Sequence, residues 1–209
     1  DICLWMSKKY IGKILREGFM TEGNIVKQII RFSIPLILGN LFQQLYNTVD
    51  SIIVGNYIGS DALAAVGSTG SLINLLLAFC VGASAGAGIV ISQFYGAKNK
   101  DGMDVAVHTT IAISAIAGLV MTAVGVLFAP GLLRLMGTPA DILPASSLYM
   151  RIFFGGIFFS VVYNFAAGIL NAVGNSAKAL QYLMIAAGAN VVFDWVFVVI
   201  FHMGVEGVA

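Results

Sequence analysis

Five long apolar runs constrain this chain more strongly than any other feature of its sequence. The runs fall near residues 32–55, 70–94, 105–128, 147–171 and 180–201. Each is long enough to cross a bilayer as a helix, which takes about 20 apolar residues. The segments between the runs are rich in Gly, Pro, Asn and Asp, which favour turns, and no run alternates with the period of a strand. The pattern predicts an all-α integral membrane protein.

The composition supports a membrane protein and argues against several other classes. The chain is 59% hydrophobic and 10% charged, whereas a soluble domain carries about 25% charged residues. A net charge of +1 gives no electrostatic basis for binding nucleic acid, so the expected partners are the lipid bilayer and small molecules. The two cysteines, Cys3 and Cys80, have neither metal-ligand spacing nor a disulfide framework, and we expect no cofactor.

Residues 1–19 differ from the rest of the chain. Their sequence, DICLWMSKKYIGKILREGF, is basic and does not begin with Met, whereas Met20 opens a stretch that is a natural start. One hypothesis is that residues 1–19 are translated upstream DNA and not native. The alternative is a short basic amphipathic helix on the membrane surface. Residues 20–209 are then expected to be the front part of a longer membrane protein.

Basic residues are distributed unevenly between the two sides of the predicted bundle. One side would receive Lys27, Arg31, Lys98, Lys100 and Lys178, and the other side Arg134 and Arg151. Cytoplasmic loops carry the excess of Lys and Arg in membrane proteins. The N-terminus is therefore predicted to lie in the cytoplasm.

Two aspartates interrupt the apolar runs. Asp50 lies in QQLYNTVDSIIVG and Asp194 in GANVVFDWVFVV, with no Lys or Arg nearby. A carboxylate inside a spanning helix costs about 2.5–3.5 kcal/mol, which is tolerated where the group faces a cavity or a partner. The first and fifth helices both run outward, so both carboxylates fall in the outer leaflet at a similar depth. We therefore expect them to share one site.

The chemistry of this site has three interpretations at the level of sequence. Asn190 precedes Asp194 by one helical turn on the same face, and amide and carboxylate oxygens are hard ligands suited to Na⁺. A carboxyl group in a low-dielectric cavity can bind a proton instead. In the third interpretation, each aspartate hydrogen-bonds a neighbouring Tyr or Asn and only joins helices.

A polar stripe leads along the first helix to Asp50. Tyr46 lies one turn before Asp50 and Gln43 about two turns before it, with Asn47 beside them. Such a stripe inside a spanning helix is expected to face a polar cavity rather than lipid.

Two further residues have a functional and a structural interpretation each. Pro35 either kinks the first helix or occupies its first turn, since that helix could begin near Ser33. Asn164, in VVYNFAAGIL of the fourth helix, is either part of the polar site or a hydrogen-bonding residue between helices.

Several stretches together resemble one transporter family. FSIPLILGNLFQQLYNTVDSIIVGNYIGSDALAAVG, ISQFYGAKNKDG and the Asn-x-x-x-Asp of the fifth helix are similar to sequences of multidrug and toxic compound extrusion (MATE) transporters. The likeness runs from about Gly23 to Ala209. It implies helices 1–5 of the N-terminal lobe of a twelve-helix transporter, with a V-shaped cavity between two lobes. It also implies alternating access and export of small organic cations in exchange for Na⁺ or H⁺.

The resemblance also implies roles for individual residues. Ion coupling is assigned to Asp50, Asn190, Asp194 and Asn164, the substrate cavity to Gln43, Tyr46 and Asn47, and a hinge to Pro35. The chain departs from the family in two places. Many members have LRxxGD after the fourth helix, where this chain has LNAVGN with Asn171 and Asn175, and many have Pro where Trp195 follows the fifth-helix Asp. We expect the full-length protein to be monomeric in a bacterial-type plasma membrane.

Other functions predict other residues. A lipid-linked precursor flippase of the same superfamily would carry basic residues for pyrophosphate in its cavity, and these helices have few, with Arg151 the exception. An intramembrane aspartyl protease also uses two aspartates, but in YD and GxGD contexts, whereas this chain has TVDS and VFDW. A purely structural membrane subunit would leave the paired carboxylates unexplained. Secondary transport by a protein that is not an enzyme is therefore the favoured interpretation.

Overall fold

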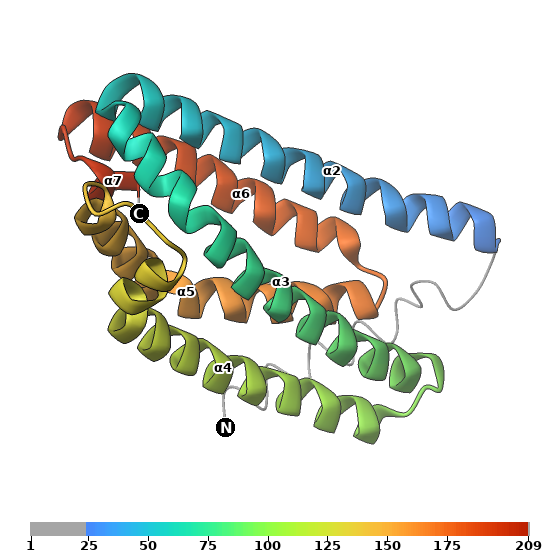
Figure 1. Ribbon diagram of the computed structural model, residues 1–209. Helices are drawn as coiled ribbons and strands as arrows, with labels where there is room; N and C mark the ends of the chain where they lie inside the picture. The colour runs from blue at the N-terminus through green and yellow to red at the C-terminus, as the bar shows by residue number, and fades with distance from the viewer. Residues whose placement is uncertain (1–23, 209) are drawn as a thin grey trace.

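The computed structural model describes residues 24–208, and every regular element in that range is a helix (Figure 1). The elements are α2 (Ile25–Ile53) with the π-helical turn η1 (Val54–Ile58), α3 (Ser60–Gly96), α4 (Lys100–Leu135), α5 (Leu143–Ala172), α6 (Ser176–Asp194) with the π-helical turn η2 (Trp195–Ile200), and the short α7 (Val205–Val208). The stretches long and apolar enough to cross a membrane are Ile25–Ile58, Val66–Gly96, Lys100–Leu135, Leu143–Ala172 and Ser176–Ile200. The predicted all-α membrane fold is confirmed, while the basic segment 1–19 lies outside the described residues.

The helices extend beyond the apolar runs that predicted them. α2 begins at Ile25 because Asn24 caps it, and the Asn24 side-chain oxygen accepts a hydrogen bond from the backbone N–H of Val26 at 3.0 Å. α4 continues through Pro130 to Leu135, past the predicted end of its run. A proline removes only one backbone hydrogen bond, and in a membrane bundle the neighbouring helices support the freed turn.

Two short capped loops lie at the end of the bundle where α2 begins (Figure 1). Asn99 accepts a hydrogen bond from the backbone N–H of Gly102 at 3.0 Å at the start of α4. Asn175 accepts one from the backbone N–H of Lys178 at 3.4 Å at the start of α6. The residues Lys27, Arg31, Lys98, Lys100 and Lys178 belong to this end, which we call the basic end. Its placement in the cytoplasm stays a prediction.

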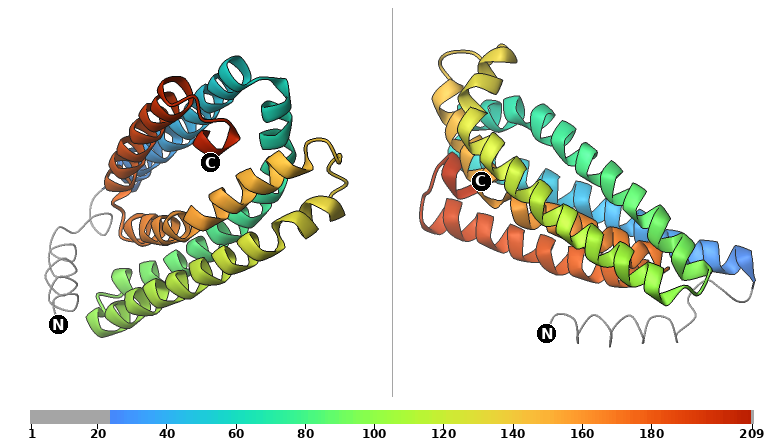
Figure 2. Two further views of the ribbon diagram at one scale, coloured as in Figure 1. Left: turned by 90° about the vertical axis from the view of Figure 1, so that its left-hand side faces the viewer. Right: turned by 90° about the horizontal axis from the view of Figure 1, so that it is seen from below.

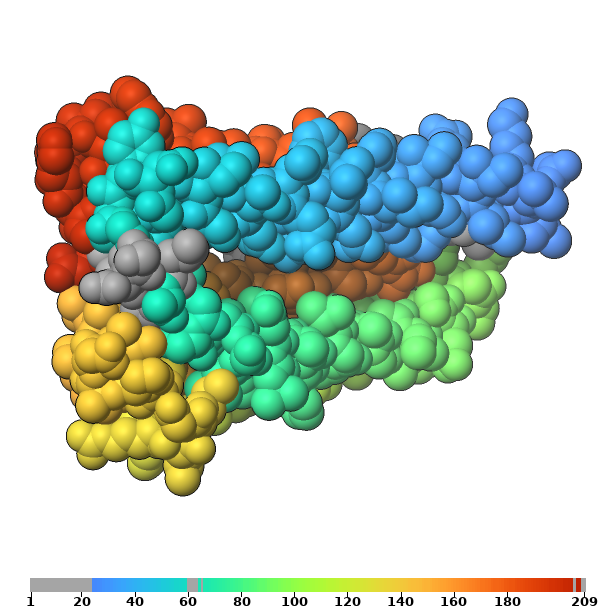
Figure 3. Space-filling view, turned by 45° about the horizontal axis from the view of Figure 1, so that its top comes forward, coloured from blue at the N-terminus to red at the C-terminus, as the bar shows by residue number. Residues whose placement is uncertain are grey.

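The spanning helices form two groups with a furrow between them. α4 and α5 form a hairpin on which α3 packs, whereas α2 packs chiefly against α6 (Figure 2). Figure 3 shows the furrow between α2 and α3, with residues of α5 at its floor. The side of α2 that does not contact α6 is thereby left open along most of its length.

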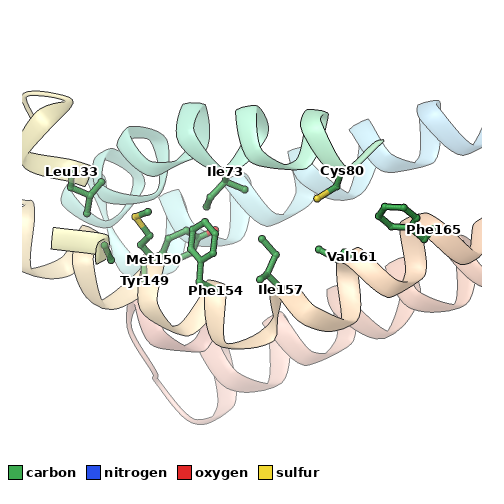
Figure 4. Packing of buried hydrophobic residues seen from close by; sticks show 10 residues of the cluster. Ile73, Cys80, Leu133, Tyr149, Met150, Phe154, Ile157, Val161 and Phe165 are labelled. Carbon is green, nitrogen blue, oxygen red and sulfur yellow. The ribbon is translucent and has the colours of Figure 1, made fainter. Parts of the chain in front are cut away.

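The main core lies between α3, α4 and α5. Its buried members are Ile73, Cys80, Ala129, Leu133, Tyr149, Met150, Phe154, Ile157, Val161 and Phe165 (Figure 4). A Cβ on Gly125 would meet the ring of Phe154, and a Cβ on Gly118 would lie 2.9 Å from a ring carbon of Phe158. Because lipid provides no hydrophobic drive between helices, such close packing holds the bundle together and positions α5 below the furrow.

Candidate functional site

Asp50 and Asp194 meet at the far end of the α2–α6 pair, opposite the basic end. Asp50 lies in the last turn of α2, and Asp194 is the last residue of α6. Their carboxyl groups come within hydrogen-bonding range of each other. Asp194 is 3% exposed and Asp50 is half-buried. The structure thus brings together the two carboxylates that the sequence placed at one depth.

A constant register between two parallel helices produces this pairing. Residues that face each other across the seam are 144 positions apart, as in Phe32 with Ser176, Gly39 with Leu183, Asp50 with Asp194 and Val54 with Val198. Gly39 is buried, and a Cβ on it would lie 3.5 Å from a methyl carbon of Leu183, so a small residue here lets the helices approach. The carboxylates face each other because both lie on this seam.

The carboxyl pair has unused hydrogen-bonding capacity. The Oδ1 of Asp50, the Oδ2 of Asp194 and the Oδ1 of Asn190 are buried, and none has a hydrogen-bond partner among the described residues. Asn190 precedes Asp194 by one turn of α6, so both project from one side of that helix. No described Lys or Arg contributes to the electrostatic surroundings of either carboxyl group. Buried oxygens normally have hydrogen-bond partners, so these three oxygens are available to share a proton or to coordinate a cation.

Tyr149 of α5 adds a phenol to the surroundings of the carboxyl pair and was not predicted from the sequence, whereas Tyr163 lies about 21 Å further along α5. Tyr149 is 7% exposed and interacts electrostatically with both Asp50 and Asp194. The hydroxyl of Tyr163 donates to the Ala179 carbonyl of α6 at 3.4 Å, and Tyr163 also lies near Tyr46 of α2. Tyr149 lies near the start of α5, at the depth of the two aspartates, and this shared depth could have predicted that it lies near them.

The predicted polar stripe on α2 lies beside Asp50. The side chains of Gln43 and Tyr46 come within hydrogen-bonding range of each other, and Tyr46 is near enough to Asp50 to sense its charge. Gln43 and Asn47 are exposed, and the backbone carbonyl of Asn47 accepts a hydrogen bond from the Ser51 hydroxyl at 2.9 Å. The stripe therefore leads from the open part of α2 to the carboxyl pair. Its role in binding substrate stays a prediction.

Asn164 lies apart from Tyr149 and is held by other contacts. Fifteen residues along α5 separate it from Tyr149, a rise of about 22 Å. Its side-chain N–H donates to the Ser160 carbonyl at 2.8 Å, and the Ser84 hydroxyl donates to its backbone carbonyl at 2.8 Å. The side chain of Asn164 thus bonds within α5, and the bond to α3 uses its backbone carbonyl, so neither its assignment to ion coupling nor the alternative of a side-chain bond between helices is tested.

Pro35 lies inside α2 and not in its first turn. The helix begins at Ile25, so the interpretation of Pro35 as a first-turn residue is wrong. Apolarity alone places the helix start near Ser33, but residues 25–32, which include polar side chains, also form helical turns. An interior proline removes a backbone hydrogen bond and weakens one turn. Pro35 therefore divides α2 into a short arm at the basic end and a long arm that carries Asp50.

Both helices of the pair change to π-helical spacing just beyond the carboxylates. The N–H of Gly59 donates to the Val54 carbonyl at 3.2 Å, and the N–H of Phe201 donates to the Val196 carbonyl at 3.0 Å. Such turns are frequent at functional sites. A cavity of about 400 Å³ lies between η1 and η2, and Tyr57 belongs to its lining, whereas neither carboxylate does. A water-filled chamber shared by the two carboxylates stays a prediction.

Comparison with known proteins places the chain in a family. The family model described as MatE matches residues 35–196. The chain is 32% identical over 189 residues to the probable multidrug resistance protein YpnP of Bacillus subtilis (strain 168), an alignment that covers 90% of this chain and 42% of YpnP. It is 35% identical over 171 residues to the probable multidrug resistance protein YoeA of the same organism, covering 82% of this chain and 37% of YoeA. The chain thus spans about two fifths of these relatives.

Solved structures agree with this placement. A crystal structure of MATE in the bent conformation matches with a TM-score of 0.83 and 30% identity, covering 94% of this chain and 42% of the other. A crystal structure of MATE in the straight conformation matches with a TM-score of 0.83 and 33% identity, covering 91% of this chain and 42% of the other. With the family model covering most of its length, the chain belongs to the MATE family of transporters and forms part of an N-terminal lobe.

Proposed function

We propose that the full-length protein exports small organic cations across a bacterial plasma membrane, as a monomer with its N-terminus in the cytoplasm. Export is driven by antiport of Na⁺ or H⁺ through a site formed by Asp50, Asn190 and Asp194. The observation that carries the proposal is the contact between two carboxyl groups that have buried, partnerless oxygens. The multidrug resistance names of the relatives support the substrate class.

Electrostatics explain why such a pair should bind a positive charge. Two ionised carboxylates in contact repel each other strongly in a low-dielectric environment, and here no described basic side chain offsets the repulsion. A shared proton or a bound Na⁺ each offsets one of the two negative charges, and Na⁺ can also take the oxygen of Asn190 as a further ligand. The pair therefore favours holding one cation or one proton at a time.

Exchange follows if a drug cation and the coupling ion compete for the same negative charge. With the carboxylates free, the stripe of Gln43, Tyr46 and Asn47 leads a cationic substrate toward them along the open side of α2. Binding of Na⁺ or H⁺ then cancels the attraction and the substrate leaves. An ion drives this cycle only if it binds the inward and outward states with different affinity. Bending of α2 at Pro35 is the change between those states.

The charge of the site favours this function over the alternatives. A lipid-linked pyrophosphate would need basic side chains, but the polar groups near the carboxylates are phenols and amides, and Arg134 and Arg151 are exposed. An aspartyl protease also pairs two carboxyl groups around water. Membership of a transporter family argues against that use of the pair.

Ion-driven efflux tests the proposal. The full-length protein is reconstituted into liposomes, and efflux of a fluorescent cationic dye is followed under an imposed Na⁺ or H⁺ gradient. The variants Asp50→Asn and Asp194→Asn are each expected to lower gradient-driven efflux by about tenfold or more, and the gradient that drives the wild type identifies the coupling ion. Asp141→Asn is the matched control, because it makes the same chemical change at an exposed carboxylate between α4 and α5. Undiminished efflux in both site variants would refute the proposed role.

A further inference from the structure

One buried side-chain hydrogen bond joins α6 to the backbone of α2. The hydroxyl of Ser176 donates to the carbonyl oxygen of Phe32 at 2.9 Å. Ser176 is 3% exposed and is the first residue of α6, directly after Asn175, which caps the helix. The cap of α6 is thus supplied by Asn175, and the Ser176 hydroxyl is used between helices.

The accepting carbonyl lies in the turn that Pro35 weakens. Pro35 has no N–H to offer the carbonyl of Arg31, and a proline ring crowds the carbonyl four residues before it, so this turn is weaker than its neighbours. Phe32 is the next residue of this turn, and its carbonyl is the one that Ser176 meets. The hydrogen bond therefore fixes α2 just before the point at which the helix bends most easily.

Few other contacts hold the short arm of α2, residues 25–34. Its apolar side chains are largely exposed, among them Ile29 at 53% and Ile30 at 54%. Beyond Pro35, the long arm packs on α6 through Gly39 and reaches the carboxyl pair at Asp50. The Ser176–Phe32 bond thus attaches the short arm directly to α6.

We propose that Ser176 is a positioning residue that latches the short arm of α2 to α6. The latch confines bending at Pro35 to the long arm, which carries Asp50. Without this hydrogen bond, bending at Pro35 also moves the short arm. Ion binding at Asp50 then moves the polar stripe on the long arm by a smaller distance than in the latched protein. The inference builds on the proposed exporter but makes a separate claim, since the latch holds whether or not the carboxyl pair binds an ion.

Distances between spin labels test the latch in the full-length protein. One label pair, Ile29→Cys with Tyr182→Cys, reports the short arm against α6, and the pair Leu45→Cys with Phe193→Cys reports the long arm. All four positions are exposed in the described chain. Each pair is measured in lipid nanodiscs, in a background without the native cysteines, for the wild type, Ser176→Ala and Ser176→Thr.

The wild type and Ser176→Thr are expected to give one narrow short-arm distance, because threonine keeps the hydroxyl. Loss of the hydrogen bond in Ser176→Ala should raise the ratio of displaced to latched molecules about fivefold. A short-arm distribution in Ser176→Ala equal to that of the wild type would overturn the latch, and so would a Ser176→Thr distribution as broad as that of the alanine variant. Either of these two results would overturn the latch and leave the proposed function untouched. Absence of gradient-driven efflux in the wild type would overturn the proposed function and leave the latch untouched.

Discussion

Asp50 and Asp194 lie within hydrogen-bonding range of each other although three spanning helices separate them in the chain. They lie on a seam between α2 and α6 that begins with the Ser176–Phe32 hydrogen bond and continues past them to Val54 and Val198. With both carboxylates ionised, the far ends of α2 and α6 repel, and with a bound cation or proton they can close. We therefore expect occupancy of this site to set the spacing between α6 and α2, the helix along which the polar stripe runs.

The two carboxylates should act as one unit in transport. We expect Asp50→Asn and Asp194→Asn each to lower ion-driven efflux by about tenfold or more, and the double variant to be no worse than the poorer single variant, because groups that bind one ion together are not additive. Initial efflux rates in proteoliposomes measure all three. Multiplicative losses in the double variant would mean that the carboxylates bind separate ions.

Replacing Pro35 should make the protein more stable and its efflux slower. In Pro35→Ala, α2 regains a backbone hydrogen bond and loses a residue that costs about 3 kcal/mol inside a helix, so thermal unfolding in detergent should shift to higher temperature. Efflux should fall, because a straight α2 bends less. Wild-type efflux from a stabilised Pro35→Ala protein would show that bending at this residue is not needed.

Gly39 should tolerate one methyl group and no more. A Cβ would meet methyl carbons of Leu183 at 3.5 Å and Leu180 at 3.7 Å, which are ordinary contacts, so Gly39→Ala should leave efflux unchanged. Gly39→Leu should wedge α2 away from α6, separate the carboxyl groups and lower both the unfolding temperature and efflux. Gly131→Leu is the control, because a Cβ on Gly131 has nothing within 4 Å. Equal behaviour of the two leucine variants would contradict the seam.

The spanning helices and the carboxyl pair could be predicted because their signals are local. The length and apolarity of each run predict a spanning helix, and counting helices outward puts Asp50 and Asp194 at one depth. The ends of α2 and α4 could not be predicted from apolarity, since Asn24 caps polar turns and α4 passes through Pro130. These features depend on caps and on neighbouring helices.

The partners supplied by other helices could not be predicted. Ser176 follows a capping Asn and has the sequence features of an ordinary helix start, and only the register of α6 against α2 brings it to Phe32. Tyr149 is one of several aromatic residues in its run, and the packing of α5 decides which of them reaches the carboxylates. One sequence contains no direct signal for such contacts between helices.

Close packing of α3 on α5 should depend on Gly168. A Cβ there would meet the Ser84 hydroxyl and lie 3.1 Å from the Ser84 backbone carbonyl oxygen, so Gly168→Ala must push the helices apart. We expect a loss of about 1–3 kcal/mol in the free energy of unfolding, measured by denaturation in detergent. Gly155→Ala on the same helix is the matched control, since a Cβ there has nothing within 4 Å. Equal stability of the two variants would show that α3 and α5 can separate without cost.

A disulfide between positions 54 and 198 would test the register of α2 against α6. It would also test whether these two helices must separate during transport. Val54 and Val198 pack together just beyond the carboxylates, at 0% and 4% exposure. In a background without the native cysteines, Val54→Cys with Val198→Cys should form a disulfide on mild oxidation, whereas Val54→Cys with the exposed Val192→Cys should not.

The disulfide would hold the far ends of α2 and α6 closed, so dye efflux should stop on oxidation and return on reduction. Mass spectrometry of the cross-linked peptides and efflux before and after reductant supply the two measurements. Cross-linking of the control pair alone would contradict the 144-residue register. Full efflux from the cross-linked protein would instead show that transport does not require these helices to separate.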